Sequence, residues 1–107
     1  MSEFGLLEDE LSLIHKLFQE TLKAKGSVKV WIFGSRAVGN FRKYSDIDLF
    51  VECEQLNAEL TAQISEKLEE SALPYKVDVV DKKKLVPEYA LSVQNSKKLL
   101  FEFGAGA

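Results

Sequence analysis

Residues 28–52 read VKVWIFGSRAVGNFRKYSDIDLFVE, and this stretch decides most of what the sequence predicts about the fold. Its first six residues are rich in β-branched and aromatic types and predict a strand that ends at Gly34. A second strand is predicted over Ile47–Glu52. Because side chains alternate between the two faces of a strand, Asp46 and Asp48 face the same way, with Cβ atoms about 7 Å apart. Two carboxylates that close repel each other, and a hard divalent cation such as Mg²⁺ would join them.

The segment between these strands has the composition of a turn that binds anions. Gly34 lets the backbone leave the first strand sharply, and Ser35 is expected to cap a one-turn helix that Gly39 closes. The unpaired N–H groups and the dipole at such a helix start favour a phosphate. On its own the glycine–serine pair is equally consistent with a plain turn. Three basic residues would add local positive charge: Arg36, Arg42 and Lys43.

Hydrophobic periodicity along the rest of the chain predicts helices and further strands. The elements are an amphipathic helix over residues 7–25 ended by Gly26, a helix marked by Leu60, Ile64 and Leu68 with Asn57 as its N-cap, a strand over residues 76–80, a helix from Pro87 to Val93, and a short closing strand over residues 99–103. Their order predicts an α/β (α+β) two-layer sandwich. In it, a small mixed sheet of three strands carries its helices on one face and leaves the other to ligands. Residues 1–107 are expected to form one domain, with residues 104–107 as a frayed tail.

Composition and charge restrict the class of protein. The 107-residue chain has a net charge of -3 and an isoelectric point near 5.2. This argues against strong nucleic-acid binding, because proteins of that class carry a basic footprint. The single cysteine, Cys53, allows neither an internal disulfide nor a cysteine-based zinc site and fits a reducing compartment. No apolar run approaches the length of a membrane span, so a cytoplasmic location without membrane contact is expected.

A third carboxylate, Asp78, lies on the predicted strand over residues 76–80. Three carboxylates can hold two metal ions about 3.5 to 4 Å apart, one activating an attacking hydroxyl and the other stabilising the leaving phosphates of an in-line displacement. An Asp-x-Asp pair alone is weak evidence, because acidic residues at a strand entry are often solvated. Its combination with Gly34, Ser35 and Asp78 favours phosphoryl or nucleotidyl transfer. Asp81 is expected to be a surface residue.

Two other phosphate or metal motifs do not fit the same stretch. A calcium-binding EF-hand loop needs an oxygen ligand and then a glycine where Phe50 and Val51 stand. A Walker A loop needs lysine and then serine or threonine where Asn40 and Phe41 stand. Both alternatives are therefore rejected.

The three parts together resemble the nucleotidyltransferase superfamily of DNA polymerase β: Gly34–Ser35, then SDIDL at residues 45–49, then VDV at residues 77–79. The chain length and the GSRA motif at residues 34–37 resemble those of the minimal nucleotidyltransferases of that superfamily. The resemblance implies that Asp46 and Asp48 ligate catalytic Mg²⁺ or Mn²⁺ and that Asp78 completes the site as metal ligand or base. It also implies that Gly34 and Ser35 hold ATP or another nucleoside triphosphate, with Arg36, Arg42 and Lys43 as the basic nucleotide-binding candidates.

The resemblance further implies a partner protein. Members of this family are commonly encoded with a helical HEPN-type toxin and act as its antitoxin, and some transfer AMP from ATP to a tyrosine of the toxin. A partner chain or self-association would then complete the acceptor site. One departure is Val38, where many relatives carry a basic residue. It keeps open a second hypothesis, a binding module that neutralises its partner by occupying surface, and a third is a nucleotidyltransferase acting on a small molecule.

Overall fold

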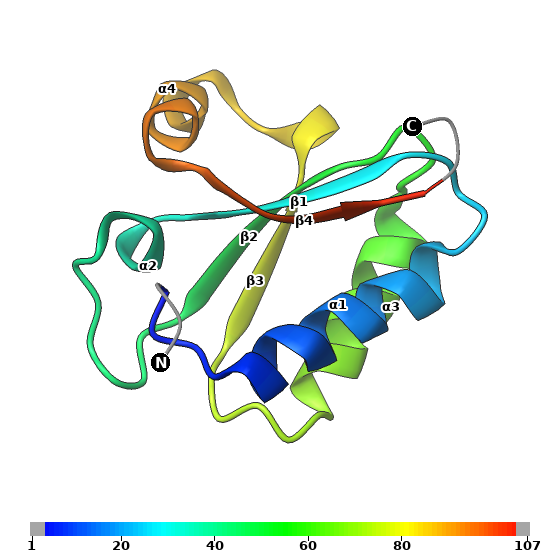
Figure 1. The fold of residues 1–107 in the computed structure, drawn as a ribbon. Helices are drawn as coiled ribbons and strands as arrows, with labels where there is room; N and C mark the ends of the chain where they lie inside the picture. Colours follow the sequence, from blue (N-terminus) through cyan, green and yellow to red (C-terminus); the bar gives the residue numbers. More distant parts are fainter. Residues whose placement is uncertain (1–3, 105–107) are drawn as a thin grey trace.

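The computed structural model describes residues 4–104, apart from the side chains of Tyr89 and Ser92, so the predicted tail from residue 105 onward lies outside the described residues. Every element predicted from the sequence is present (Figure 1). The elements in chain order are α1 (Glu8–Leu22), β1 (Val28–Phe33), α2 (Ser35–Val38), β2 (Ile47–Glu52), α3 (Ala58–Glu69), β3 (Val77–Asp81), the 3₁₀ turn η1 (Lys82–Lys84), α4 (Pro87–Ser96) and β4 (Lys98–Phe103). No helix within residues 4–104 is long and apolar enough to cross a membrane.

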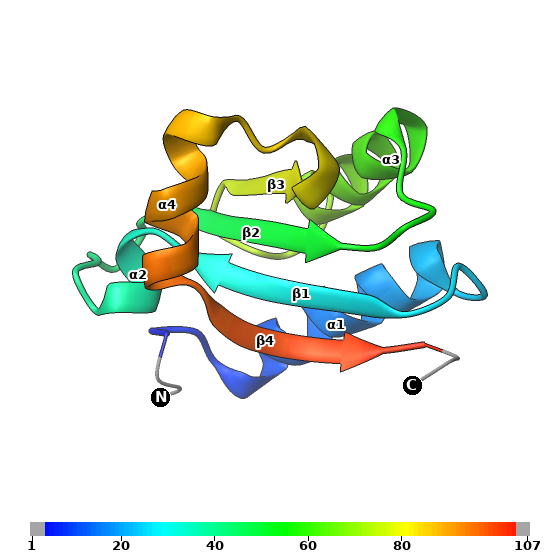
Figure 2. The ribbon, with the colours of Figure 1, turned by 90° about the horizontal axis from the view of Figure 1, so that it is seen from above.

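The strands form one mixed sheet in the order β3-β2-β1-β4, as Figure 2 shows. β1 runs antiparallel to both β2 and β4, whereas β2 and β3 are parallel and are joined through α3. The predicted mixed sheet is confirmed. It has four strands instead of three, because the closing strand KLLFEF pairs with the free edge of β1.

The main core lies between the sheet and the helices α1 and α3, which pack side by side on one face (Figure 1). Apolar residues recur about every 3.6 residues along the helices and every second residue along the strands, so their apolar faces meet in this one layer. Its fully buried members include Ile14, Phe18 and Leu22 of α1, Ile64 and Leu68 of α3, Val28, Val30 and Ile32 of β1, and Ile47, Leu49 and Val51 of β2. The outward residues of β1 and β2 are therefore free to build the second face.

The helix ends follow local chemistry. The Asn57 side chain accepts a hydrogen bond of 2.8 Å from the Leu60 N–H, which confirms it as the N-cap of α3. α1 ends at Leu22, three residues earlier than predicted. The reason is that Ala24 already adopts the left-handed conformation, with φ of 64°, before the chain reaches Gly26.

The second face of the sheet carries α4, which lies opposite α1 and α3 (Figure 1). The ammonium of Lys97 lies 4.2 Å from the ring centroid of Trp31 and 5.5 Å from that of Phe50, and Val93 of α4 is buried. The prediction had all helices on one face. The difference arises because Trp31 and Phe50 point away from the main core and need an apolar cover of their own.

Asp81 is buried, with 4% of its surface exposed, so its expected surface position is wrong. Its Oδ1 accepts a 2.9 Å hydrogen bond from the Lys83 N–H, and the Lys83 ammonium lies 3.8 Å from Oδ2. That ammonium also donates to the carbonyls of Cys53, Glu54 and Leu56 at 2.9, 2.9 and 2.7 Å. Lys83 therefore ties η1 to the loop between β2 and α3, a contact that no local sequence pattern announces.

Candidate active site

Three predicted carboxylates gather at one end of the sheet. Asp48 on β2 is in register with Phe33 on β1 and with Asp78 on β3, so these three side chains form a row on the face that carries α4. Asp46 immediately precedes β2 and follows the same alternation as Asp48. Because β2 is the neighbour of both other strands, it carries its acidic pair between the Gly34 turn and the third carboxylate.

The turn after β1 lies directly against Asp48. Gly34 has φ of 74° and ψ of -153°, and a Cβ added to it would lie 2.6 Å from Oδ2 of Asp48. Glycine is therefore needed both for the backbone conformation and for the approach of the carboxylate. The predicted one-turn helix is present, and Gly39 ends it in the left-handed conformation with its N–H bonded to the Ser35 carbonyl. The predicted cap is wrong, however, because Gly34 is the N-cap and Ser35 is the first helical residue.

The pKa of Asp48 reflects the acidic groups that lie near it. Burial raises the pKa of the Asp48 carboxyl above its usual 3.8, and the negative charges of Asp78 and then Asp46 raise it further. Lys76 opposes these effects in part, and its ammonium lies 3.9 Å from Oδ1 of Asp78. Asp78 and Asp46 thus both repel the Asp48 carboxylate, and a cation placed beside it would relieve that repulsion.

The donor chemistry of this group fits a hard divalent cation. All three groups offer carboxylate oxygens, the ligands that Mg²⁺ and Mn²⁺ prefer. Among residues 4–104, no three histidine, cysteine, aspartate or glutamate side chains are already arranged so that they could hold a metal ion. The carboxylates therefore share a location without forming a finished coordination sphere, and side-chain rotation about χ1 and χ2 would be needed to converge on an ion.

Arg36 was predicted to contact phosphate, and in the structure its guanidinium is bound by backbone carbonyls and packs on aromatic rings. Its side chain is buried, with 1% of the residue exposed, and Nη1 donates to the Phe4 carbonyl at 2.9 Å. Nε and Nη2 donate to the Ser45 carbonyl at 3.1 and 2.9 Å, and the guanidinium carbon lies 4.6 Å from the Tyr75 ring centroid. Arg36 therefore supports the loop that leads into Asp46. The sequence carries no signal for this role, because the partners are backbone carbonyls and a ring distant in the chain.

The other two basic candidates lie in the loop between α2 and β2. The backbone N–H of Arg42 donates to Oγ of Ser45 at 2.7 Å, and the Lys43 ammonium lies 5.4 Å from the Tyr44 ring centroid. The side chains of Arg42 and Lys43 are both exposed. They are the positive groups that this loop presents to solvent, close in sequence to Asp46.

A cleft of about 780 Å³ opens beside Asp48 and Asp78. Its volume lies in the range typical of small-ligand sites. Apart from the two carboxylates, its lining includes Val80 on β3, Val86 before α4 and Val93 within α4, with Lys84 as a basic neighbour. Sequence reasoning missed these residues because it did not place the helix after Pro87 on the face that carries the aspartates. The buried Phe50 on that face was the signal that such a cover exists.

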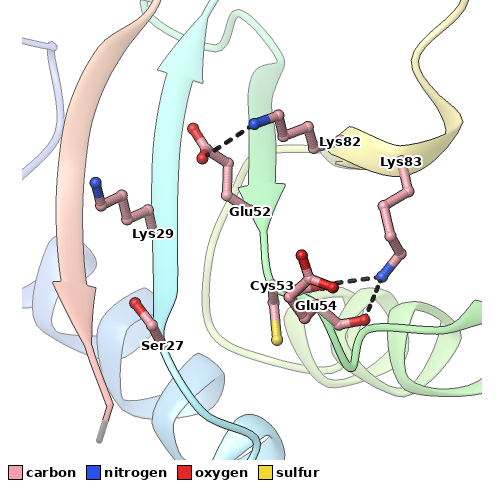
Figure 3. A pocket seen from close by; sticks show the side chains of 7 residues that line it. All are labelled: Ser27, Lys29, Glu52, Cys53, Glu54, Lys82 and Lys83. Carbon is pink, nitrogen blue, oxygen red and sulfur yellow. Dashed lines mark hydrogen bonds and ion pairs between the residues drawn. The ribbon is translucent and has the colours of Figure 1, made fainter. Parts of the chain in front are cut away.

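A smaller cavity of about 290 Å³ lies at the opposite end of β2 (Figure 3). Lys82 pairs with Glu52 there at 3.4 Å, and Lys83 bonds to the carbonyl of Glu54, as Figure 3 shows. Cys53 also lines this cavity and is a buried, free thiol. Because most of its charges are paired and it holds none of the predicted site residues, the cleft beside Asp48 is the better candidate.

Known proteins with similar sequences and folds indicate the family of this chain. A family described as "Polymerase beta, Nucleotidyltransferase" matches residues 14–103. The probable protein adenylyltransferase MntA of Haemophilus influenzae is 34% identical over 85 residues, which cover 76% of this chain and 72% of that protein.

Two solved complexes contain chains of the same fold. A toxin–antitoxin structure with AMP-PNP contains a chain that is 27% identical, with a TM-score of 0.70 and with 85% of this chain and 72% of that chain covered. A complex of a tri-AMPylated HEPN toxin of Shewanella oneidensis with an MNT antitoxin gives 25% identity and a TM-score of 0.63, covering 85% and 68%. The chain belongs to the polymerase β family of nucleotidyltransferases and, within it, to the minimal nucleotidyltransferases.

Proposed function

We propose that this chain is a cytoplasmic, divalent-metal-dependent enzyme that transfers AMP from ATP to a tyrosine hydroxyl of a HEPN-type toxin and so acts as the antitoxin. The observation that carries the proposal is the row of Asp48 and Asp78 with the Gly34 turn against Asp48. A triphosphate needs a turn without a side chain, and a metal needs carboxylates within reach of the same phosphates. Asp48 satisfies both requirements, because it lies against the Gly34 turn and in register with Asp78.

The residues of the proposed site have three roles: metal binding, triphosphate binding and positioning of a loop. Asp46, Asp48 and Asp78 would hold Mg²⁺ or Mn²⁺, which supplies charge neutralisation for the phosphates and the leaving group when bound. The Gly34 turn, with Ser35 and the exposed Arg42 and Lys43, would bind the triphosphate. Arg36 acts here as a positioning residue that fixes the loop before Asp46, in place of the direct phosphate contact expected from the sequence.

The proposed transfer is an in-line displacement at the α-phosphorus of ATP. The acceptor oxygen forms a bond to the α-phosphorus, and the bond from that phosphorus to the bridging oxygen of the β-phosphate breaks. Pyrophosphate leaves with the electron pair of the broken bond. Asp78 serves either as a metal ligand or as the base that takes the hydroxyl proton.

The relatives support the choice of nucleotide, acceptor class and partner. The Haemophilus relative is described as a probable protein adenylyltransferase, which supports AMP as the transferred group and a protein as the acceptor. The Shewanella complex joins an AMPylated HEPN toxin to an MNT antitoxin, which supports a HEPN-type partner here. A tyrosine is the acceptor that the family resemblance implies.

The test uses labelled ATP, Mg²⁺ and a HEPN-type protein, taken from the adjacent gene where one is encoded there. Wild type should transfer the label to a tyrosine of that protein, read by mass spectrometry, and a variant carrying Asp46→Asn and Asp48→Asn should not. Glu52→Gln is the matched control, since Glu52 lies on the same strand and the same face but pairs with Lys82 at the far end. Transfer that survives in the double variant would overturn the catalytic assignment.

A second candidate function is favoured by one observation, the exposed apolar side chain of Val38. It is 61% exposed at the end of α2, beside the turn proposed for the triphosphate, where an apolar group suits contact with a protein better than with phosphate. In this alternative the chain neutralises its partner by covering it. Full neutralisation of the toxin by the Asp46→Asn, Asp48→Asn variant would favour occupancy, whereas a labelled low-mass product formed without any partner would favour a small-molecule acceptor.

A further inference from the structure

Lys76 lies on the same face of the sheet as the three carboxylates. Asp48 on β2 is in register with Asp78 on β3, and the two strands are parallel. One residue before β2 and β3 respectively, Asp46 therefore lies beside Lys76, and the Ile47 N–H donates to the Lys76 carbonyl at 2.9 Å. The two strands thus place four charged side chains in a block of two rows, with one ammonium among three carboxylates.

The charge of Lys76 acts on both strands of this block. Its ammonium lies 3.9 Å from Oδ1 of Asp78 on its own strand. On the neighbouring strand, burial and the negative charges of Asp78 and Asp46 raise the pKa of the Asp48 carboxyl, and the ammonium opposes that rise. Lys76 therefore stabilises the ionised carboxylates in the same sense as a bound cation would.

The ion pair is built so that it can be broken. The side chain of Lys76 is 72% exposed and that of Asp78 is 47% exposed, and exposed pairs of this kind hold their side chains only loosely. The flexible four-carbon stem of lysine lets the ammonium turn into solvent. A divalent ion carries twice the charge and binds carboxylate oxygens directly. Because it also repels the ammonium, the two cations compete for the space beside Asp78.

We propose that Lys76 is the resident counter-ion of the three carboxylates, and that a divalent ion reaches Asp78 by displacing the Lys76 ammonium. This inference rests on the proposed function, because it takes Asp46, Asp48 and Asp78 as the residues that hold the metal. Lys76 then acts as a positioning residue that keeps the carboxylates together before the metal binds. It also lowers the affinity of the site for the ion.

A rival role for Lys76 predicts the opposite effect on metal binding. If the ammonium held Asp78 in the orientation that a metal needs, loss of the charge would weaken the binding of the ion. If Lys76 is a competing cation, loss of the charge strengthens it. A divalent ion about 6 Å from an ammonium in watery surroundings is disfavoured about tenfold, which sets the size of the expected change.

Manganese binding to the intact chain without nucleotide separates the two roles. The loss of the electron paramagnetic resonance signal of free Mn²⁺ measures the affinity. Lys76→Gln, which keeps a polar side chain and removes the charge, should bind Mn²⁺ about tenfold more tightly than wild type. Lys76→Arg keeps the charge and should stay close to wild type. Equal or weaker Mn²⁺ binding by Lys76→Gln would overturn the proposal.

Lys29→Gln is the matched control, because it removes the same charge at the other end of the sheet. Lys29 is exposed on β1, where it is in register with Glu52 instead of with the carboxylates of the site. Its loss should change the Mn²⁺ affinity much less than the loss of Lys76. A tenfold gain in both variants would assign the effect to net charge and refute a specific role for Lys76.

Nuclear magnetic resonance can follow the displacement itself in the wild type. The side-chain ¹⁵N signal of Lys76 should shift over the same range of Mg²⁺ concentration that saturates the site, whereas that of Lys29 should not. A Lys76 signal that stays constant while Mg²⁺ binds would contradict the displacement.

Failure of this inference and failure of the proposed function give different results. Mn²⁺ binding that disappears in the Asp46→Asn, Asp48→Asn variant but is unaffected by Lys76→Gln would refute the counter-ion role and leave the metal assignment standing. Absence of Mn²⁺ binding from the wild type and from Lys76→Gln alike would overturn both.

Discussion

Gly34→Ala is the substitution whose effect follows most directly from the geometry. The backbone at Gly34, with φ of 74° and ψ of -153°, lies in a region that is nearly restricted to glycine, and forcing alanine into it costs about 1–3 kcal/mol. The added methyl group would also lie 2.6 Å from Oδ2 of Asp48, against an ordinary contact of 3.4 Å or more. The Asp48 carboxylate must therefore move by about 0.8 Å, and displacements of about 1 Å can cost about 100-fold in rate.

Gly39→Ala separates the two parts of this effect. Gly39 also has a positive φ, 81°, so alanine there should cost about 1–2 kcal/mol of backbone strain. Nothing lies within 4 Å of its added Cβ, so no carboxylate moves. Both variants should lose stability by urea unfolding, but only Gly34→Ala should also lose AMP transfer and Mn²⁺ affinity, the latter read by electron paramagnetic resonance without any partner. Equal losses of transfer and Mn²⁺ affinity in the two variants would refute the reasoning.

The remaining predictions concern charge and burial. Asp48→Asn should stabilise the metal-free protein at about pH 7. The pKa of the Asp48 carboxyl is raised in the folded state, so the stability of the wild type falls as the pH rises above 3.8. Urea titrations should show that the difference in free energy of unfolding between variant and wild type closes near pH 4. Lys83→Met should lower the free energy of unfolding by about 1.5–3 kcal/mol, since it strips an ammonium from three carbonyls and from buried Asp81. Lys82→Met, which removes an exposed ion pair, should cost at most about 1 kcal/mol. Arg36→Lys should speed amide exchange in the loop over residues 40–46, because one ammonium cannot replace the forked guanidinium; unchanged exchange would contradict the positioning role.

Local sequence patterns predicted β2 and β3, the strands that place Asp46, Asp48 and Asp78. Alternation along β2 put Asp46 and Asp48 on one face, and the strand predicted over residues 76–80, observed as Val77–Asp81, carries Asp78. The register that brings Asp48 beside Asp78 follows from parallel pairing through α3, a topology with few alternatives. The two strands were predictable because alternation and strand propensity depend on neighbours in sequence.

The parts that the sequence could not predict depend on distant contacts. Arg36 has an ordinary loop composition around it, and only the fold brings Phe4 and Tyr75 to its guanidinium. Asp81 looked like a surface charge because only the fold sets its inward register opposite Val51 and brings the Lys83 ammonium to the loop after β2. The face chosen by α4, and hence the cleft, is likewise set by packing rather than by periodicity.

The late pairing of β4 with β1 has a consequence for how the chain is made. β1 emerges from the ribosome early and meets β2 soon afterwards, but its second edge stays open until residues 98–103 have been synthesised. During that interval the strand offers unpaired backbone donors and acceptors to other nascent chains. All three carboxylates precede α4 in the chain, so a polypeptide stopped after α4 would contain every acidic group of the site and still be prone to aggregation.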